Sequence, residues 1–178
     1  MRIIGGVARG RRILAPEGVK TRPMTDEIKE ALFNMLGVVD GLRVLDSYAG
    51  SGAIGLEALS RGAASVDGVE QSRLAAEIIR RNLASLGFGD SYRLFEQPIE
   101  TWLKRAQAKP AAYDLIFADP PFGKLEGAVL NQLAGLLNAN GLLIVRYFHK
   151  LEQPKPSGTR LVKSRRYGDS VLAIYGKY

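Results

Sequence analysis

The residues best suited to chemistry form one short run, Asp119-Pro120-Pro121-Phe122, directly after an apolar segment. An exocyclic amine of a nucleic-acid base is a poor nucleophile, because its lone pair is delocalised into the ring. Asp119 offers a carboxylate and Pro120 a carbonyl, and together they could accept both amine hydrogens and free the lone pair. The prolines stiffen this backbone, and Phe122 offers a face for stacking a base. The run indicates group transfer to a base amine; its simpler interpretation is a Pro-Pro turn after a strand.

A glycine-rich turn, Ala49-Gly50-Ser51-Gly52, follows an earlier apolar segment that ends at Asp46. Together with Gly55, its glycines spell the G-x-G-x-x-G pattern of dinucleotide sites, where backbone closely approaches a ligand. The pattern alone is weak, because glycine serves equally well in a tight turn without a ligand. The surrounding acids are needed to choose between these interpretations.

Two acidic residues indicate which ligand the turn would hold. Glu70 ends the next apolar segment, and its two oxygens could accept both hydroxyl protons of an adenosine ribose. Asp46 would repel a pyrophosphate but suits a ligand that carries an ammonium and a sulfonium. S-adenosylmethionine has both cations and no phosphate, so it is favoured over NAD. The candidate cofactor residues are Asp46, Tyr48, Ala49, Gly50, Ser51, Gly52, Glu70, Gln71, Gln97 and Asp119.

Alternating strands and helices must position these residues. Short apolar segments predict strands over residues 43–46, 64–69, 92–95, 114–118 and 141–147, and periodic segments predict helices over 25–37, 53–61, 72–86, 99–106 and 125–137. Hairpins are expected at residues 1–13 and 159–177. This alternation predicts an α/β, Rossmann-like fold with a mostly parallel sheet, in one domain spanning residues 1–178. Ligands of such sheets bind at the carboxyl ends of the strands, where all the candidate residues fall.

The net charge of +7 is concentrated at the two ends of the chain. Residues 1–22 hold six Lys/Arg and one acid, and residues 146–178 hold eight Lys/Arg and two acids. Basic surfaces attract phosphate backbones by releasing counterions. We therefore expect residues 1–24 to form a basic RNA-binding arm, with Arg2, Arg9, Arg11, Arg12, Lys20 and Arg22 as contacts. Lys163, Arg165 and Arg166 form a second candidate cluster; the alternative is that both ends are simply solvated.

Other classes of function are excluded by composition. The chain has no cysteine and one histidine, His149, which excludes disulfides, thiolate nucleophiles and cysteine or multi-histidine metal sites. No metal site is expected. The sequence shows neither a bilayer-length apolar stretch nor a signal-peptide core, so a cytoplasmic protein without membrane contact is expected.

Several stretches occur in the same order as in one known family. They are Met1-Arg2-Ile3-Ile4-Gly5-Gly6 with Arg9-Gly10-Arg11-Arg12, Arg22-Pro23 with Asp26 and Glu30-Ala31-Leu32-Phe33-Asn34, the turn Ala49-Gly50-Ser51-Gly52 through Ala63, and Asp119-Pro120-Pro121. Over nearly its full length the chain resembles the RsmD family, bacterial guanine-N2 methyltransferases of small-subunit (16S) ribosomal RNA.

The resemblance implies a class I S-adenosylmethionine-dependent methyltransferase fold with a seven-stranded sheet and a last antiparallel hairpin. It also implies an N2-methylguanine product, a base turned out of its stack, and ribosomal RNA presented on an assembling 30S particle. A monomer is expected. The chain departs from the family pattern at Met24, usually Thr; at Glu27, usually Arg; at Gln97, often an acid at the adenine edge; and at Phe122, usually Tyr.

Three alternatives remain open on the residues. The same run could methylate the N6 amine of adenine in DNA or RNA. The glycine pattern could belong to an NAD-dependent oxidoreductase, although Asp46 opposes it. The chain could also be a non-catalytic RNA-binding protein on a methyltransferase fold, although the presence of Asp46, Glu70 and Asp119 together speaks against this.

Overall fold

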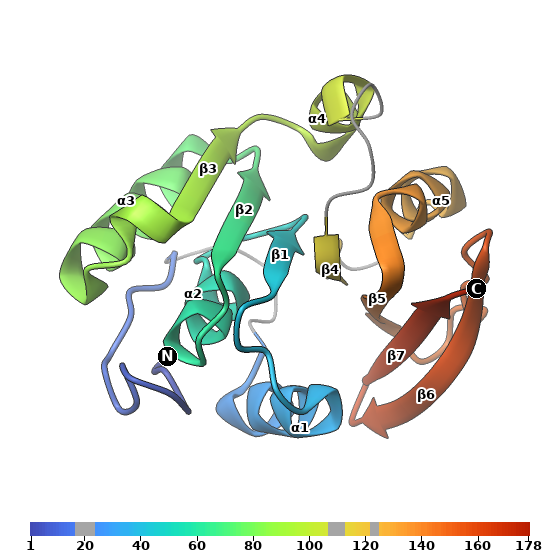
Figure 1. The fold of residues 1–178 in the computed structure, drawn as a ribbon, viewed down its shortest axis with the longest axis horizontal. Coiled ribbons are helices and arrows are strands. Elements are labelled where there is room, and N and C mark those ends of the chain that lie inside the picture. Colours follow the sequence, from blue (N-terminus) through green and yellow to red (C-terminus); the bar gives the residue numbers. More distant parts are fainter. Residues whose placement is uncertain (17–23, 107–112, 122–124) are drawn as a thin grey trace.

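A seven-stranded sheet runs through the molecule, in the order β3-β2-β1-β4-β5-β7-β6 (Figure 1). The computed structural model describes residues 1–16, 24–106, 113–121 and 125–178. The strands are β1 (Arg43–Asp46), β2 (Ser65–Glu70), β3 (Tyr92–Glu96), β4 (Tyr113–Ala118), β5 (Leu137–Phe148), β6 (Thr159–Tyr167) and β7 (Ser170–Lys177). Strands β1 to β5 pair in parallel, whereas β7 pairs antiparallel with β5 and β6. The predicted mostly parallel sheet with a C-terminal antiparallel hairpin is confirmed.

The first helix precedes the first strand, the other helices connect the parallel strands, and local signals set most of the helix ends. They are α1 (Asp26–Leu36), α2 (Ala53–Ser60), α3 (Arg73–Leu86), α4 (Ile99–Ala106) and α5 (Gly127–Gly135), with a 3₁₀ turn η1 (Gly89–Ser91) before β3. Thr25 caps α1 by accepting the Ile28 N–H, and Ser72 caps α3 by accepting the Ala75 N–H. Gly87 ends α3 in the left-handed conformation. None of the described helices is long and apolar enough to cross a bilayer.

One boundary differs from the prediction. The helix expected over residues 125–137 ends at Gly135, and β5 begins at Leu137 rather than at residue 141. Leu137 is fully buried and pairs with Tyr113 at the start of β4. Burial of this apolar side chain against the neighbouring strand therefore extends β5 at the expense of the helix.

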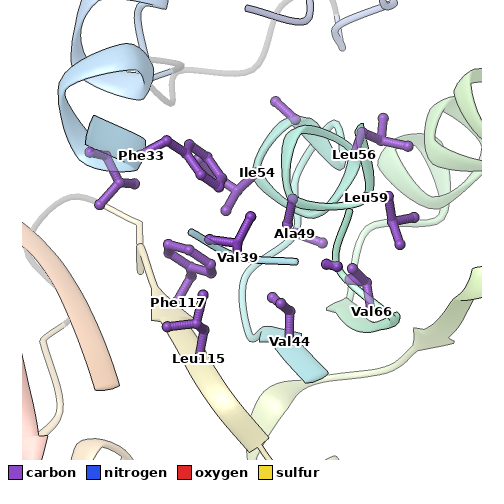
Figure 2. Packing of buried hydrophobic residues seen from close by; sticks show 14 of the residues in the cluster. Phe33, Val39, Val44, Ala49, Ile54, Leu56, Leu59, Val66, Leu115 and Phe117 are labelled. Carbon is purple, nitrogen blue, oxygen red and sulfur yellow. The ribbon is translucent and has the colours of Figure 1, made fainter. Parts of the chain in front are cut away.

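Helices cover both faces of the sheet, because successive strand residues point to opposite sides. Val44 and Phe117 face α1 to α3, whereas Leu45 and Ile116 face α4 and α5. Figure 2 shows the first core: Phe33 of α1 lies near Phe117, with ring centroids 6.1 Å apart, while apolar side chains of α2 pack toward β1 and β2. The two cores fix the strands whose carboxyl ends carry the candidate site.

The N-terminal segment doubles back as predicted, but with little strand pairing. One antiparallel bridge joins Arg2 and Arg12, and the Ile13 N–H donates to the Met1 carbonyl at 3.1 Å. The buried side chains of Ile3 and Ile13 hold this segment on the core. The predicted hairpin is thus a packed loop with a single bridge.

A buried carboxylate holds the same segment on helix α2. Glu57 of α2 accepts the N–H groups of Ile4 and Gly5 at 2.8 Å each and pairs with Arg61 at 2.8 Å. Lys29 of α1 is fully buried, and its ammonium lies 3.3 Å from Glu57. Removing one partner of a buried ion pair leaves the other charge buried and uncompensated. Lys29 and Glu57 therefore depend on each other where α1, α2 and the N-terminal segment meet.

Candidate active site

A cavity of about 460 Å³ opens at the carboxyl ends of the parallel strands. This volume is typical of sites for small molecules and cofactors. Most of the predicted cofactor and catalytic residues line it, namely Asp46, Tyr48, Ala49, Gly50, Ser51, Glu70, Gln71, Gln97, Asp119 and Pro121. Gly52 and Pro120 are adjacent to lining residues but do not line it themselves, and Phe122 lies outside the described residues. The structure therefore brings two distant motifs to one cavity.

The glycine-rich turn after β1 forms one wall of this cavity. Gly50 and Gly52 have positive φ angles of 56° and 78°, which only glycine adopts readily, and the Gly52 N–H closes the turn on the Ala49 carbonyl at 2.7 Å. Gly55 serves a different purpose, because a Cβ there would meet the Tyr92 ring at 2.7 Å and Val66 at 2.9 Å. The third glycine of the pattern therefore lets α2 pack closely on the sheet.

Glu70, at the end of β2, ties this turn to the start of α3. One carboxylate oxygen accepts the Gly50 N–H at 2.8 Å and the other accepts the Ser72 N–H at 2.7 Å. A carboxylate oxygen has two lone pairs, so each keeps one further acceptor position, and Glu70 lines the cavity. Glu70 can thus support the turn and still accept hydrogen bonds from a ligand.

Asp46 lies at the base of the cavity and is only 3% exposed. Its carboxylate accepts the Gly55 N–H at 3.1 Å, near the N-terminus of α2. Burial raises the pKa of Asp46 to about 7, with Asp119 and Glu70 adding repulsion and the Gly55 hydrogen bond opposing the shift. An ionised Asp46 is therefore costly unless a cation is bound beside it.

Asp119, at the end of β4, forms an ion pair that the sequence did not reveal. The Arg146 guanidinium of β5 donates to Asp119 Oδ2 at 2.8 Å and to the Ser170 hydroxyl at 3.2 Å. The Asp119 side chain is 33% exposed, whereas that of Arg146 is 6% exposed. Desolvation raises the pKa of Asp119 to about 6, and Arg146 opposes this rise. The available signal was a single charged residue within the apolar run 141–147.

The charge of the cavity favours a cationic ligand. Its described lining includes the carboxylates of Asp46, Glu70, Glu100, Asp119 and Glu126 and a single guanidinium, that of Arg146. Such a lining would repel a pyrophosphate. Among the described residues, no three His, Asp or Glu side chains form a group that could hold a metal ion.

The N-terminal segment contributes to the cavity as well as to the surface. Met1, Ala15, Pro16 and Met24 line the cavity, a contact that the charge pattern alone did not indicate. The predicted RNA-binding arginines Arg2, Arg9, Arg11 and Arg12 are exposed. Two of them also make protein contacts, because Arg2 pairs with Asp26 at 3.0 Å and Arg11 donates to the Ser85 carbonyl at 2.7 Å. Lys20 and Arg22 lie outside the described residues.

Comparison with known proteins gives consistent matches over most of the chain. Residues 1–176 match the profile of a family described as "Conserved hypothetical protein 95". The Bacillus subtilis protein YlbH is 35% identical over 183 residues, 99% of both chains. "Ribosomal RNA small subunit methyltransferase D" of Escherichia coli strain K12 is 39% identical over 144 residues, which cover 80% of this chain and 69% of that protein.

Solved structures agree with these matches. The Escherichia coli protein yhhF superposes with a TM-score of 0.86 at 34% identity, covering 99% of this chain and 97% of that one. A more distant structure, solved in complex with SAH, gives a TM-score of 0.69 at 15% identity over 84% of this chain and 48% of that one. The distant match supports the fold alone, which is the Rossmann-like fold of class I methyltransferases.

Proposed function

The chain belongs to the RsmD family, and on that premise we propose that it transfers a methyl group from S-adenosylmethionine to the N2 amine of a guanine in 16S ribosomal RNA. One observation carries the proposal. The Asp119-Pro120-Pro121 run and the acids Asp46 and Glu70 belong to different strands, yet Asp119, Asp46 and Glu70 line one cavity. The name of the Escherichia coli relative supports ribosomal RNA of the small subunit as the substrate class.

The cavity fits S-adenosylmethionine by its donor and acceptor set. The remaining acceptor positions of Glu70 suit the two ribose hydroxyls, and Asp46 suits the positive charges of the methionine part. The turn at Gly50 lets backbone approach the ligand, and Gln71 and Gln97 line the cavity beyond Glu70. When bound, the cofactor supplies an activated methyl group on its sulfonium.

Asp119 and the Pro120 carbonyl are the two acceptors for the amine of the target base. Arg146 occupies Oδ2 of Asp119, which fixes the carboxylate and directs Oδ1 to the amine. Accepting both amine hydrogens frees the nitrogen lone pair, and the remaining task is in-line positioning against the methyl group. Phe122 follows directly in the chain and provides the stacking face for the base.

The N-terminal arm, residues 1–24, binds the phosphate backbone around the target base. Its arginines at positions 2, 9, 11 and 12 are exposed, and the buried Glu57 fixes the backbone of the arm at Ile4 and Gly5. Basic residues on a fixed backbone lose little entropy when they bind phosphate. We propose that the arm holds 16S RNA, presented on an assembling 30S particle, over the cavity of a monomeric enzyme.

The ion pair between Arg146 and Asp119 predicts a specific change in pH dependence. Asp119 must be ionised to accept the amine, so kcat/KM should fall as pH decreases through about 6. Arg146→Met removes the cation that stabilises the ionised form of Asp119. The acidic limb of the profile, where kcat/KM falls with decreasing pH, should therefore move to higher pH. Arg146→Lys keeps a positive charge and should therefore reverse part of this shift. The pH profile of methyl transfer over pH 5–9 measures this.

Four other carboxyl groups line the cavity and must be considered in that profile. They are those of Asp46, Glu70, Glu100 and Glu126. S-adenosylmethionine is therefore kept saturating at every pH, so that protonation of Asp46 does not limit the rate, and Arg146→Met should still move the fall in rate to higher pH. If the acidic limb lies at the same pH with and without Arg146, the proposed role of Arg146 in stabilising and positioning the Asp119 carboxylate is contradicted.

Labelled methyl transfer tests the proposed function. Purified protein and labelled S-adenosylmethionine are incubated with free 16S RNA, with small-subunit particles that lack the modification, and with DNA. We expect label in the RNA, with the particle as the better substrate. Label in DNA alone, or none in any nucleic acid despite cofactor binding, would contradict the proposal.

A further inference from the structure

Strand β6 forms the edge of the sheet next to β7 (Figure 1). Every residue from Arg160 to Arg166 is exposed, which is unusual for a nine-residue strand paired along its length. The strand contains Arg160, Lys163, Arg165 and Arg166 and no acidic residue. Exposed cations therefore recur along the strand, with the exposed apolar Leu161 and Val162 between two of them, and the proposed cavity chemistry does not use these cations.

A bulge in β6 places three of these cations on one face. In a regular strand, residues 160 and 163 would point to opposite faces. The register of β6 against β7 shifts between Leu161 and Lys163, so Val162 is an extra residue. Arg160 then pairs with Gly176, Lys163 with Ile174 and Arg165 with Leu172, which are alternate residues of β7 and share a face. We call Arg160, Lys163 and Arg165 the basic stripe.

The identity of that face follows from the packing of β7. Leu172 and Ile174 belong to the core beneath α1 to α3 and the N-terminal segment. The opposite face of β7, with Val171, Ala173 and Tyr175, belongs to the core beneath α4 and α5. The basic stripe therefore lies on the same side of the sheet as the N-terminal arm.

The stripe also leads to the cavity. Arg165 lies opposite Leu172, and Leu172 lies opposite Arg146 on β5. Leu172 and Arg146 both line the cavity. From Arg165 the stripe extends away from the cavity by two β7 residues per cation, a step of roughly 6.5 Å. This step is comparable to the separation of successive phosphates along a nucleic-acid strand.

We propose that Arg160, Lys163 and Arg165 bind consecutive phosphates of the RNA substrate and form a second contact in addition to the N-terminal arm. This inference rests on the proposed function, because the RNA substrate is part of that proposal. The arm and the stripe then hold the substrate on two sides of the cavity. The stripe contributes affinity and orientation and leaves the base amine to Asp119.

Basic residues on an edge strand have another known use, which is to prevent strands of other molecules from pairing there. Edge protection can use both charges and bulges, but it does not require that the cations share a face or align with a cavity. Arg160, Lys163 and Arg165 meet both conditions, because the bulge at Val162 puts them on one face and Arg165 lies next to cavity-lining Leu172. Binding of RNA therefore accounts for more of the observed arrangement.

The test compares two variants that each lose three positive charges. The stripe variant carries Arg160→Gln, Lys163→Gln and Arg165→Gln. The control carries Lys104→Gln, Arg105→Gln and Lys155→Gln; these residues are exposed and lie on α4 and in the loop before β6. Affinity for a 16S RNA fragment is measured by fluorescence anisotropy across salt concentrations, S-adenosylmethionine affinity by calorimetry, and oligomeric state by light scattering.

We expect the stripe variant to lose about tenfold or more in RNA affinity and to reduce the salt slope by about 2–3, since each phosphate contact contributes roughly 0.7–0.9. The KM for RNA should rise while kcat and cofactor affinity stay near the wild-type values. An affinity equal to that of the control would overturn the inference, as would self-association of the stripe variant without weaker RNA binding. Because RNA binding is measured without catalysis, a wild-type protein that binds RNA but transfers no methyl group refutes the proposed function separately.

Discussion

Replacing Asp119 with alanine should slow methyl transfer by about two orders of magnitude while the protein stays folded. A hydrogen bond to a charged group contributes about 1.5–3 kcal/mol, which corresponds to a factor of roughly 10–150 in rate. The alanine variant loses this bond and also breaks the ion pair between Asp119 and the buried Arg146. Single-turnover rates at saturating cofactor and RNA measure the effect on the chemical step.

Asp119→Asn distinguishes the charge of this residue from its hydrogen bond. The amide keeps a carbonyl acceptor at the same place but carries no charge, so an intermediate rate is expected. Its rate should also lose the acidic limb near pH 6, because the titrating group is gone. Asp90→Asn, an exposed acid of η1, serves as the control. Wild-type rates in Asp119→Ala would refute the assignment of the amine acceptor.

Replacing Asp46 with asparagine should abolish cofactor binding and stabilise the ligand-free protein. The pKa of Asp46 is about 7 in the fold, against the model-compound value of 3.8. Between these values the folded state binds a proton that the unfolded state does not, so this group lowers stability as pH rises from about 4 to 7. Above pH 7 the full cost is present, on the order of a few kcal/mol. Asparagine removes the charge and keeps an acceptor for the Gly55 N–H.

Melting temperatures at two pH values measure this effect. At pH 8, Asp46→Asn should melt higher than the wild type by about 5–10 °C, while at pH 5 the difference should be small. Calorimetry should show that wild-type affinity for S-adenosylmethionine falls below pH 7, because the cation needs the ionised carboxylate. A variant that is equally destabilised at both pH values, or that binds the cofactor normally, would contradict the role of Asp46.

Local sequence signals were sufficient for most of the elements. Thr25 and Ser72 mark the starts of α1 and α3, and Gly87 marks the end of α3, because capping depends on only a few neighbouring residues. The two motifs were also placed correctly, since both follow parallel strands and the carboxyl ends of such strands meet at one edge.

Contacts between residues far apart in the chain could not be predicted from the sequence patterns. The partner of Asp119 is Arg146, 27 residues away in another strand, and neither residue type alone indicates the other. Lys29 is fully buried and pairs with Glu57 on a different helix, and no signal within α1 indicates that partner. The bulge at Val162 depends on how β6 aligns with β7, and alternation counted along one strand misses it. Each of these features required the packed fold.

The product nucleoside is the most direct test of the central claim. Ribosomal RNA methylated by the purified protein with labelled S-adenosylmethionine is digested to nucleosides, which are separated and identified by mass spectrometry. The proposed function predicts label in N2-methylguanosine, with none from Asp119→Ala. Label in N6-methyladenosine, or in any nucleoside methylated elsewhere than on the guanine N2 amine, would contradict it.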